Sequence, residues 1–206
     1  MRLRILAPVA LLIWLLAAAV APRSAYDVVI RGGTIYDGGG GAPFTGDVAI
    51  RGDQIVAVGR VRGLGAREID ARGLAVAPGF INMLSWANES LIQDGRSQSD
   101  IRQGVTLEVM GEGWSMGPFN PEMKRLAVQR QSDIRYPIAW ATLGEYLEYL
   151  ERRGIAPNVA SFVGAASVRV HELGEGDVDP DPAQLARMRA LVRRAMDEGA
   201  MGVPAR

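Results

Sequence analysis

The sequence predicts an α/β chain in which a strand-rich region precedes a region of alternating strands and helices. Residues 26–77 are rich in β-formers and are interrupted by glycine turns. From residue 74 onward, strand-like apolar runs alternate with amphipathic helical segments. The run at 74–81 is almost wholly apolar, which is typical of a strand buried on both faces of a parallel sheet. A length of 206 residues allows one or two domains.

The first residues have the pattern of a secretory signal. Met1-Arg-Leu-Arg is basic, residues 5–22 carry no charge, and Ala19-Val-Ala fits a small-residue cleavage site. We therefore expect residues 1–21 to be a signal peptide and the mature chain to be periplasmic or secreted. The alternative is an uncleaved anchor, because the uncharged run is close to the lower limit of about 18 residues for a spanning helix.

Composition excludes several classes of function. Acidic and basic residues balance at 23 each, and no stretch combines arginine with aromatic residues, so nucleic acid is not expected as a partner. The absence of cysteine excludes disulfides, zinc–cysteine clusters and thiol catalysis. His171 is the only histidine, and one histidine cannot supply the His-rich set of three protein ligands that a catalytic zinc site usually takes.

Turn signals divide the strand-rich region. Tyr26-Asp-Val-Val-Ile-Arg reads as a strand, and Val48-Ala-Ile and Ile55-Val-Ala-Val flank a hairpin turn at Arg51-Gly-Asp-Gln. The glycine run at 38–41 raises the alternative of a phosphate-binding loop. It lacks the Gly-Lys-Ser/Thr of a P-loop and does not open a helix, so we assign it to a loop.

Helix and strand signals alternate in the second region. Ser97 is a possible cap for a short helix ending at Gly104, and residues 105–110 form the next strand-like run. Thr142 and Glu145 have capping-box spacing, and the helix that follows ends at Gly154. Its apolar stripe is assigned to the protein core and consists of Leu143, Tyr146, Leu147 and Leu150.

A further strand and helix complete the pattern. Residues 159–163 read as a strand, and Asp181-Pro-Ala-Gln begins a capped helix that stops at Glu198-Gly. Residues 200–203 look like the start of a fourth strand. The predicted buried face of the last helix consists of Leu185, Met188, Leu191, Val192 and Ala195.

Four stretches carry a family resemblance. They are Tyr26–Asp37, Asp47–Gly59, Ile69–Phe80 and the phrase Pro-Gly-Phe-Ile-Asn-Met-Leu-Ser-Trp-Ala-Asn at 78–88. Together they resemble the opening of the amidohydrolase superfamily, and most of all its N-acyl-D-amino-acid deacylase (D-aminoacylase)-like branch. The resemblance implies an α/β fold with a small β-sandwich followed by a (β/α)₈ barrel of the TIM type.

The resemblance also sets the expected domains. Residues 22–77 would form the β-sandwich part, and residues 78–206 the first half of a metal-dependent-hydrolase barrel. A complete barrel takes about 250 residues, which is more than the chain provides, so we expect the barrel to be incomplete and the chain to be a fragment or truncated form.

The resemblance implies a divalent metal ion, zinc, but the residues expected to bind it are replaced. In the family the phrase continues Pro-Gly-Phe-Ile-Asp-x-His-x-His, and both histidines bind metal. Here Leu84 and Trp86 occupy the histidine positions and Asn82 that of the aspartate. Gly113 occupies the position of a metal-binding cysteine, which leaves Glu112 beside it as a weak substitute ligand.

Candidate binding residues follow the strands, because barrel active sites lie at the carboxyl ends of the strands. Asn82 and Ser85 are candidates to hydrogen-bond a substrate, while Trp86 and Trp114 offer apolar surface. Ordinary strand-end packing is the alternative. His171 is expected in a solvated loop after the third strand, and no catalytic residue is assigned.

The resemblance implies a hydrolase that acts on non-peptide carbon–nitrogen bonds, with a small N-acyl-amino-acid-like amide as substrate. The alternative is a secreted relative that binds small molecules or is inactive, because the usual ligands are absent. No stable membrane partner is expected unless the signal segment is uncleaved.

Overall fold

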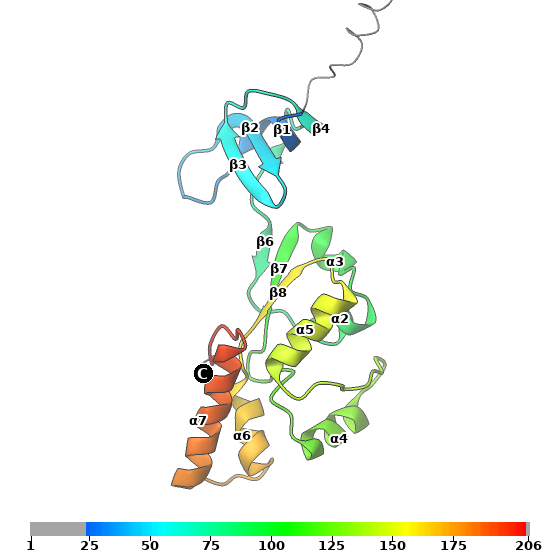
Figure 1. Ribbon diagram of the computed structural model, residues 1–206, viewed down its shortest axis with the longest axis vertical. Coiled ribbons are helices and arrows are strands. Elements are labelled where there is room, and N and C mark those ends of the chain that lie inside the picture. Colours follow the sequence, from blue (N-terminus) through cyan, green and yellow to red (C-terminus); the bar gives the residue numbers. More distant parts are fainter. Residues whose placement is uncertain (1–23, 205–206) are drawn as a thin grey trace, which may run out of the picture. The chain divides into compact units, whose positions relative to one another are not determined.

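The computed structural model describes residues 24–204, which divide into two compact units between Pro78 and Gly79 (Figure 1). The predicted signal peptide at 1–21 lies outside the described residues. Within residues 24–204, no helix is both long and apolar enough to cross a membrane.

The first unit contains one mixed sheet with the strand order β3-β2-β1-β4, and β5 also pairs with β1. Its strands are β1 (Tyr26–Ile35), β2 (Phe44–Arg51), β3 (Gln54–Gly59), β4 (Gly65–Asp70) and β5 (Ala75–Val76). β1 runs antiparallel to β2 and parallel to β4 and β5. The predicted β2–β3 hairpin is confirmed, with Arg51 opposite Gln54. Among residues 24–78, the second layer of the predicted β-sandwich is not seen.

Arg31 links the strands of this sheet through its guanidinium group. It donates to Glu68 on β4 at 2.7 and 2.8 Å, to Asp47 on β2 at 3.2 Å, and to the backbone oxygen of Val61 at 3.1 Å. Beneath it the core is small, with Val29 and Ala49 fully buried. A planar group with several fixed donors suits this position, because each neighbour lies in a different direction.

The second unit contains a three-stranded parallel sheet in the order β6-β7-β8. Its strands are β6 (Phe80–Asn82), β7 (Val105–Met110) and β8 (Asn158–Ser161). Its helices are α2 (Ser90–Gln93), α3 (Gln98–Ile101), α4 (Pro121–Arg130), α5 (Leu143–Arg153), α6 (Ala165–Leu173) and α7 (Pro182–Asp197). The predicted alternation of parallel strands and helices is therefore present, although the described strands do not close a barrel.

The run at 74–81 is not the single buried strand that its composition predicts. Residues 75–76 form β5 in the first unit, and residues 80–82 form β6 in the second. Pro78 lies between them and lacks the amide hydrogen that a continuous strand requires. Leu74, Phe80 and Ile81 are exposed, which is the opposite of the prediction.

Both predicted capping boxes are confirmed. The Thr142 hydroxyl accepts from the Glu145 amide at 3.2 Å, and the Glu145 carboxylate accepts from the Thr142 amide at 3.1 Å. Asp181 and Gln184 make the same reciprocal pair at the start of α7. Each box satisfies amides that the first helical turn leaves without an intrahelical partner.

One prediction about helix details is wrong, and another is confirmed in part. Ser97 makes no side-chain cap, because its backbone is left-handed at φ 42° and its hydroxyl donates to Glu108 instead. On α7, Ala195 is buried and Met188, Leu191 and Val192 pack against the core while partly buried, whereas Leu185 is exposed. Among the described elements α7 packs mainly on α6, so most of its apolar stripe lies at the edge of the core of the second unit.

Residues 200–203 are not assigned as a strand, yet they extend the sheet. The Met201 amide donates to Ser161 at 2.9 Å, and the Val163 amide donates to Gly202 at 3.0 Å. These bonds place the segment along β8, where the predicted fourth strand would lie.

The core of the second unit is built around Trp140, which the sequence analysis did not single out. Its ring centroid lies 5.2 Å from that of Tyr146 and 5.0 Å from that of Tyr149. Its indole nitrogen donates to the Met116 oxygen at 2.7 Å, so its polar atom is satisfied inside the core. Leu91, Met110, Leu143 and Leu150 are almost fully buried in the same cluster.

Candidate functional site

The loops after β6 and β7 meet at the carboxyl edge of the parallel sheet and border a hollow of about 10 Å³, which has room for no more than one water molecule. The first loop contributes Leu84, Ser85, Trp86 and Asn88, and the second contributes Gly111, Glu112 and Trp114. We call this hollow the strand-end cavity. The predicted convergence of these two loops is therefore present, as parallel strands require.

The start of α6 lies against the second loop. The Ala166 amide donates to the Gly113 oxygen at 3.0 Å, and the Gly164 amide donates to the Ser115 hydroxyl at 2.9 Å. Ser115 is buried, and its amide donates to the Ser167 hydroxyl at 2.9 Å. Hydrogen bonds with Gly164, Ala166 and Ser167, at the start of α6, thus hold the glycine-rich loop that carries Glu112 and Trp114.

Gly111 allows β7 to turn into this loop. It has φ +89°, and a Cβ atom there would lie 2.2 Å from the Phe162 oxygen. Glycine alone combines that backbone conformation with so close an approach. The contact brings the ends of β7 and β8 together directly beside the strand-end cavity.

Ser85 lines the cavity but is itself buried. Its hydroxyl donates to the Glu108 carboxylate at 2.7 Å and accepts from the Ala87 amide at 3.1 Å. Glu108 lies fully buried on β7 and also accepts from the Ser97 hydroxyl at 2.8 Å. The hydroxyl proposed from the sequence as a substrate contact is thus already engaged in holding the loop to the strand.

The other candidate side chains are more accessible. Trp86 is 70% exposed and Trp114 is 51% exposed, so both indoles offer surface at the strand ends. Asn82 accepts from the Leu84 amide at 3.3 Å, a local turn that orients the loop after β6. It does not line the strand-end cavity, whereas both tryptophans do.

Asn88 is a site residue that the sequence analysis missed. Its backbone oxygen accepts from the buried Tyr146 hydroxyl at 2.9 Å, and burial raises the pKa of Tyr146, which keeps this donor protonated. Its side-chain oxygen Oδ1 is the buried side-chain polar atom without a hydrogen-bond partner in residues 24–204. This oxygen is inaccessible to a water molecule, so it is an unpaired acceptor inside the packed loop and not an exposed ligand contact. The available signal was a polar residue in the loop directly after a strand.

The described residues do not fit a catalytic metal ion. Within residues 24–204, no group of three or more histidine, cysteine, aspartate or glutamate side chains is arranged to hold one. Leu84 and Trp86 flank Ser85 in the cavity wall and offer no donor atom. Glu112 is the carboxylate that lines this cavity, and one such ligand does not make a site.

His171 does not lie in a solvated loop, and that prediction is wrong. It is part of α6, a segment of alanine, serine and valine that forms a helix directly after Gly164. The His171 side chain is only 22% exposed, and its Nδ1 lies 3.2 Å from Glu172. It lines a different hollow from Glu112, so the two side chains share no site.

A larger apolar cavity of about 320 Å³ adjoins the strand ends. Trp114 lines both hollows, so the two share a wall. At the cavity's edge the Tyr136 hydroxyl donates to Glu89 at 2.8 Å, and burial raises the pKa of Tyr136 ahead of the effect of this bond. α4, which supplies one side of the cavity, was not predicted.

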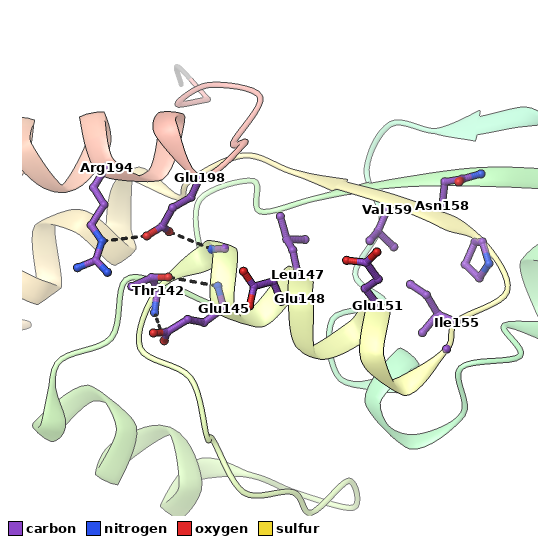
Figure 2. Close-up of a pocket in the computed structure, with 13 residues that line it drawn as sticks. Thr142, Glu145, Leu147, Glu148, Glu151, Ile155, Asn158, Val159, Arg194 and Glu198 are labelled. Atoms are coloured by element: carbon purple, nitrogen blue, oxygen red, sulfur yellow. Dashed lines mark hydrogen bonds and ion pairs between the residues drawn. The ribbon is translucent and has the colours of Figure 1, made fainter.

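A hollow of about 630 Å³ lies along α5 rather than at the strand-end cavity (Figure 2). Its polar groups serve local structure. Glu145 caps its own helix, Glu198 accepts from the Gly144 amide at 3.0 Å and from Arg194 at 2.8 Å, and Glu148 pairs with Arg152. This arrangement stabilises helix ends and offers no reactive pair.

Comparison with known proteins identifies relatives of both units. No protein-family model matches the chain. The chain is 36% identical over 188 residues to N-acyl-D-aspartate deacylase of Alcaligenes xylosoxydans xylosoxydans, a match that covers 89% of the chain and 37% of that protein. It is 30% identical over 183 residues to D-aminoacylase of the same organism, covering 86% of the chain and 37% of that protein.

Solved structures agree. A crystal structure of D-aminoacylase, described as defining a subset of amidohydrolases, matches with a TM-score of 0.73 and 30% identity, over 86% of this chain and 38% of that one. N-acyl-D-glutamate deacylase from Bordetella bronchiseptica matches with a TM-score of 0.74 and 27% identity, over the same shares. Over its length, the chain is a D-aminoacylase-like amidohydrolase relative.

The D-aminoacylase-like chain spans a little over a third of the length of these relatives. The Bordetella protein was solved with zinc and a phosphonate inhibitor, and a binuclear metal centre is described for D-aminoacylase. In this chain Leu84 and Trp86 stand in the wall of the strand-end cavity, at the positions where the resemblance implies metal-binding histidines.

Proposed function

We propose that the protein hydrolyses the non-peptide carbon–nitrogen bond of N-acyl amino acids, with D-amino-acid derivatives as the substrate class. The observation that carries this proposal is the 36% identity to N-acyl-D-aspartate deacylase, which extends over 89% of the chain. The structural match to N-acyl-D-glutamate deacylase, solved with a mimic of the reaction's tetrahedral intermediate, supports the same substrate class.

The architecture belongs to the same proposal. Residues 22–77 would contribute to a small β-sandwich, and residues 78–206 to the first half of a (β/α)₈ barrel. The parallel order β6-β7-β8 and the bonds from residues 201–202 to β8 support a barrel that continues in this direction. The signal pattern at 1–21 supports a periplasmic or secreted location, which N-terminal sequencing of the exported protein would test.

At the strand ends the chain's own residues would bind and orient the substrate. Trp86 and Trp114 would pack on its apolar surface. Asn82 would hold the loop in place through its bond to Leu84. N-acyl-D-glutamate deacylase from Bordetella bronchiseptica was solved with zinc. The side chains of residues 24–204 do not form a set of zinc ligands, so the proposal includes no step at a metal.

A second candidate function is the binding of N-acyl amino acids without hydrolysis. Leu84 and Trp86, which replace potential ligands with apolar side chains, favour it. The two candidates share a ligand class and differ in whether the amide is cleaved.

The deciding experiment offers the full chain N-acetyl-D-aspartate and, as a control, its L-enantiomer. Release of free amine from the D-compound alone supports hydrolysis. Saturable binding of the D-compound by calorimetry, with no amine released, supports the binding function. Neither binding nor cleavage of either enantiomer contradicts both candidates.

A further inference from the structure

The 320 Å³ cavity beside the strand ends has the size and lining of a ligand pocket. Pockets for small ligands usually have volumes of about 300–1,000 Å³ and predominantly apolar walls. Here α4 contributes Met123 and Leu126, the segment after β7 contributes Phe119, and α6 contributes Val170. The volume corresponds to about ten water molecules, since each takes about 30 Å³ in the liquid.

The polar groups of this cavity are already paired with one another. Tyr136 donates to Glu89, and the Gln131 side chain bonds both the oxygen and the amide of Tyr136 at 2.9 and 3.2 Å. The Arg130 guanidinium bonds the Glu175 carboxylate at 2.6 and 3.1 Å. A charged ligand would have to break one of these pairs, whereas an apolar ligand would leave them all in place.

Trp114 connects this cavity to the proposed reaction site. Its indole lines both the apolar cavity and the strand-end cavity. A ligand that lies across Trp114 would therefore place a polar amide at the strand ends and an apolar extension against α4.

We propose that the 320 Å³ cavity, hereafter the acyl cavity, binds the aliphatic acyl chain of an N-acyl amino acid. This inference rests on the proposed function, because it assigns the unreactive end of the same ligand. It specifies the substrate further: a methylene takes nearly the same volume as a water molecule, so the cavity has room for an acyl chain of up to about ten carbons, whereas an acetyl group leaves most of it empty.

The test measures binding of N-acetyl-, N-butanoyl- and N-hexanoyl-D-aspartate to the full chain by calorimetry. Each methylene that enters an apolar cavity should tighten binding about fourfold. Ala127→Phe places a ring in the acyl cavity and should abolish this dependence on chain length. Val128→Phe is the matched control, because Val128 is the next residue of α4, is exposed and does not line the cavity.

Two results would overturn the proposal: equal affinity for the three acyl groups, or an undiminished gain per methylene in Ala127→Phe. Should circular dichroism show that Ala127→Phe does not fold, a hexanoyl analogue with a terminal photoreactive diazirine gives a second readout on the unchanged chain. Labelling within residues 114–138, or at Glu89, Val170 or Glu175, supports the proposal, and labelling confined to residues that do not line the cavity contradicts it.

The same experiments separate this inference from the proposed function. Binding that tightens with acyl length, without release of amine, supports the acyl cavity and contradicts hydrolysis. Cleavage that proceeds with no dependence of binding on acyl length supports hydrolysis and contradicts the acyl cavity.

Discussion

The Ser85 hydroxyl donates a 2.7 Å hydrogen bond to the carboxylate of Glu108, a side chain with no exposed surface. Ser85 lies in the loop after β6, and Glu108 lies on β7. The second oxygen of Glu108 accepts from Ser97 at 2.8 Å, so one buried carboxyl group fixes two separate segments. The loop after β6 is therefore held to β7 by a buried polar contact as well as by apolar packing.

Replacement of Ser85 by alanine should destabilise the second unit by about 1–3 kcal/mol, because a buried acceptor loses its donor. Urea unfolding followed by tryptophan fluorescence measures this, since Trp86, Trp114 and Trp140 all lie in that unit. Ser99→Ala is the matched control: Ser99 is exposed, and its loss should change stability by less than about 0.5 kcal/mol. Equal effects of the two changes would contradict the role assigned to Ser85.

Gly111 and Gly113 provide a second pair of matched substitutions. Both have positive φ, but an added Cβ at Gly111 would meet the Phe162 oxygen at 2.2 Å, whereas at Gly113 it would meet nothing within 4 Å. Gly111→Ala should therefore cost about 1–3 kcal/mol more than Gly113→Ala in urea unfolding, because the shared backbone strain cancels. Similar losses in the free energy of unfolding for the two variants would show that the space between the ends of β7 and β8 can accommodate a Cβ atom at residue 111.

Local signals in the sequence were sufficient for the capped helices. Thr142 with Glu145, and Asp181 with Gln184, satisfy each other within one helical turn, so neither pair depends on the rest of the chain. Asn120 before Pro121 carries the same kind of signal, and Asn120 accepts from the Met123 amide at 2.8 Å. The sequence alone could have predicted α4, and with it one wall of the acyl cavity.

Contacts between distant residues were not predictable in this way. Ser97 looked like a helix cap because capping is the usual role of serine before a helix, but Glu108, far along the chain, competes for its hydroxyl. His171 was placed in a loop because its helix has no side-chain cap at Gly164 to mark where it begins. The burial of the unpaired Asn88 Oδ1 atom depends on how the loops after β6 and β7 pack together, and no local sequence signal predicts that packing.

The purified chain should not retain zinc, because Leu84, Trp86 and Gly113 stand where the resemblance implies ligands. Elemental analysis after dialysis at neutral pH measures this directly. The double change Leu84→His and Trp86→His provides the contrast, since it restores two imidazole ligands on one loop and should raise the zinc content. Stoichiometric zinc in the unchanged protein would contradict the prediction.

In the first unit, the Arg31 guanidinium holds the pKa of Glu68 at about 2, assisted by a hydrogen bond from the Gly65 amide. An unperturbed glutamate has a pKa of about 4.3. A group whose pKa is lower in the folded state adds stability above its unfolded pKa, and this contribution disappears as the pH falls through the folded pKa. The sheet should therefore lose the contribution of Glu68 between about pH 4.3 and pH 2.

Glu68→Gln should remove that contribution at neutral pH and flatten the acid dependence of the first unit. Hydrogen exchange of the β1 peptide, measured by mass spectrometry, should show faster exchange than the unchanged protein at pH 6. The difference between the two proteins should shrink as the pH falls toward 2, where Glu68 itself becomes about half protonated. Comparison at equal pH cancels the intrinsic exchange rate, and Asp53→Asn in the β2–β3 turn controls for the loss of one negative charge. A difference in β1 exchange rate between Glu68→Gln and the unchanged protein that stays the same at every pH would contradict the prediction. It would show that the negative charge of Glu68 does not hold Arg31 in place.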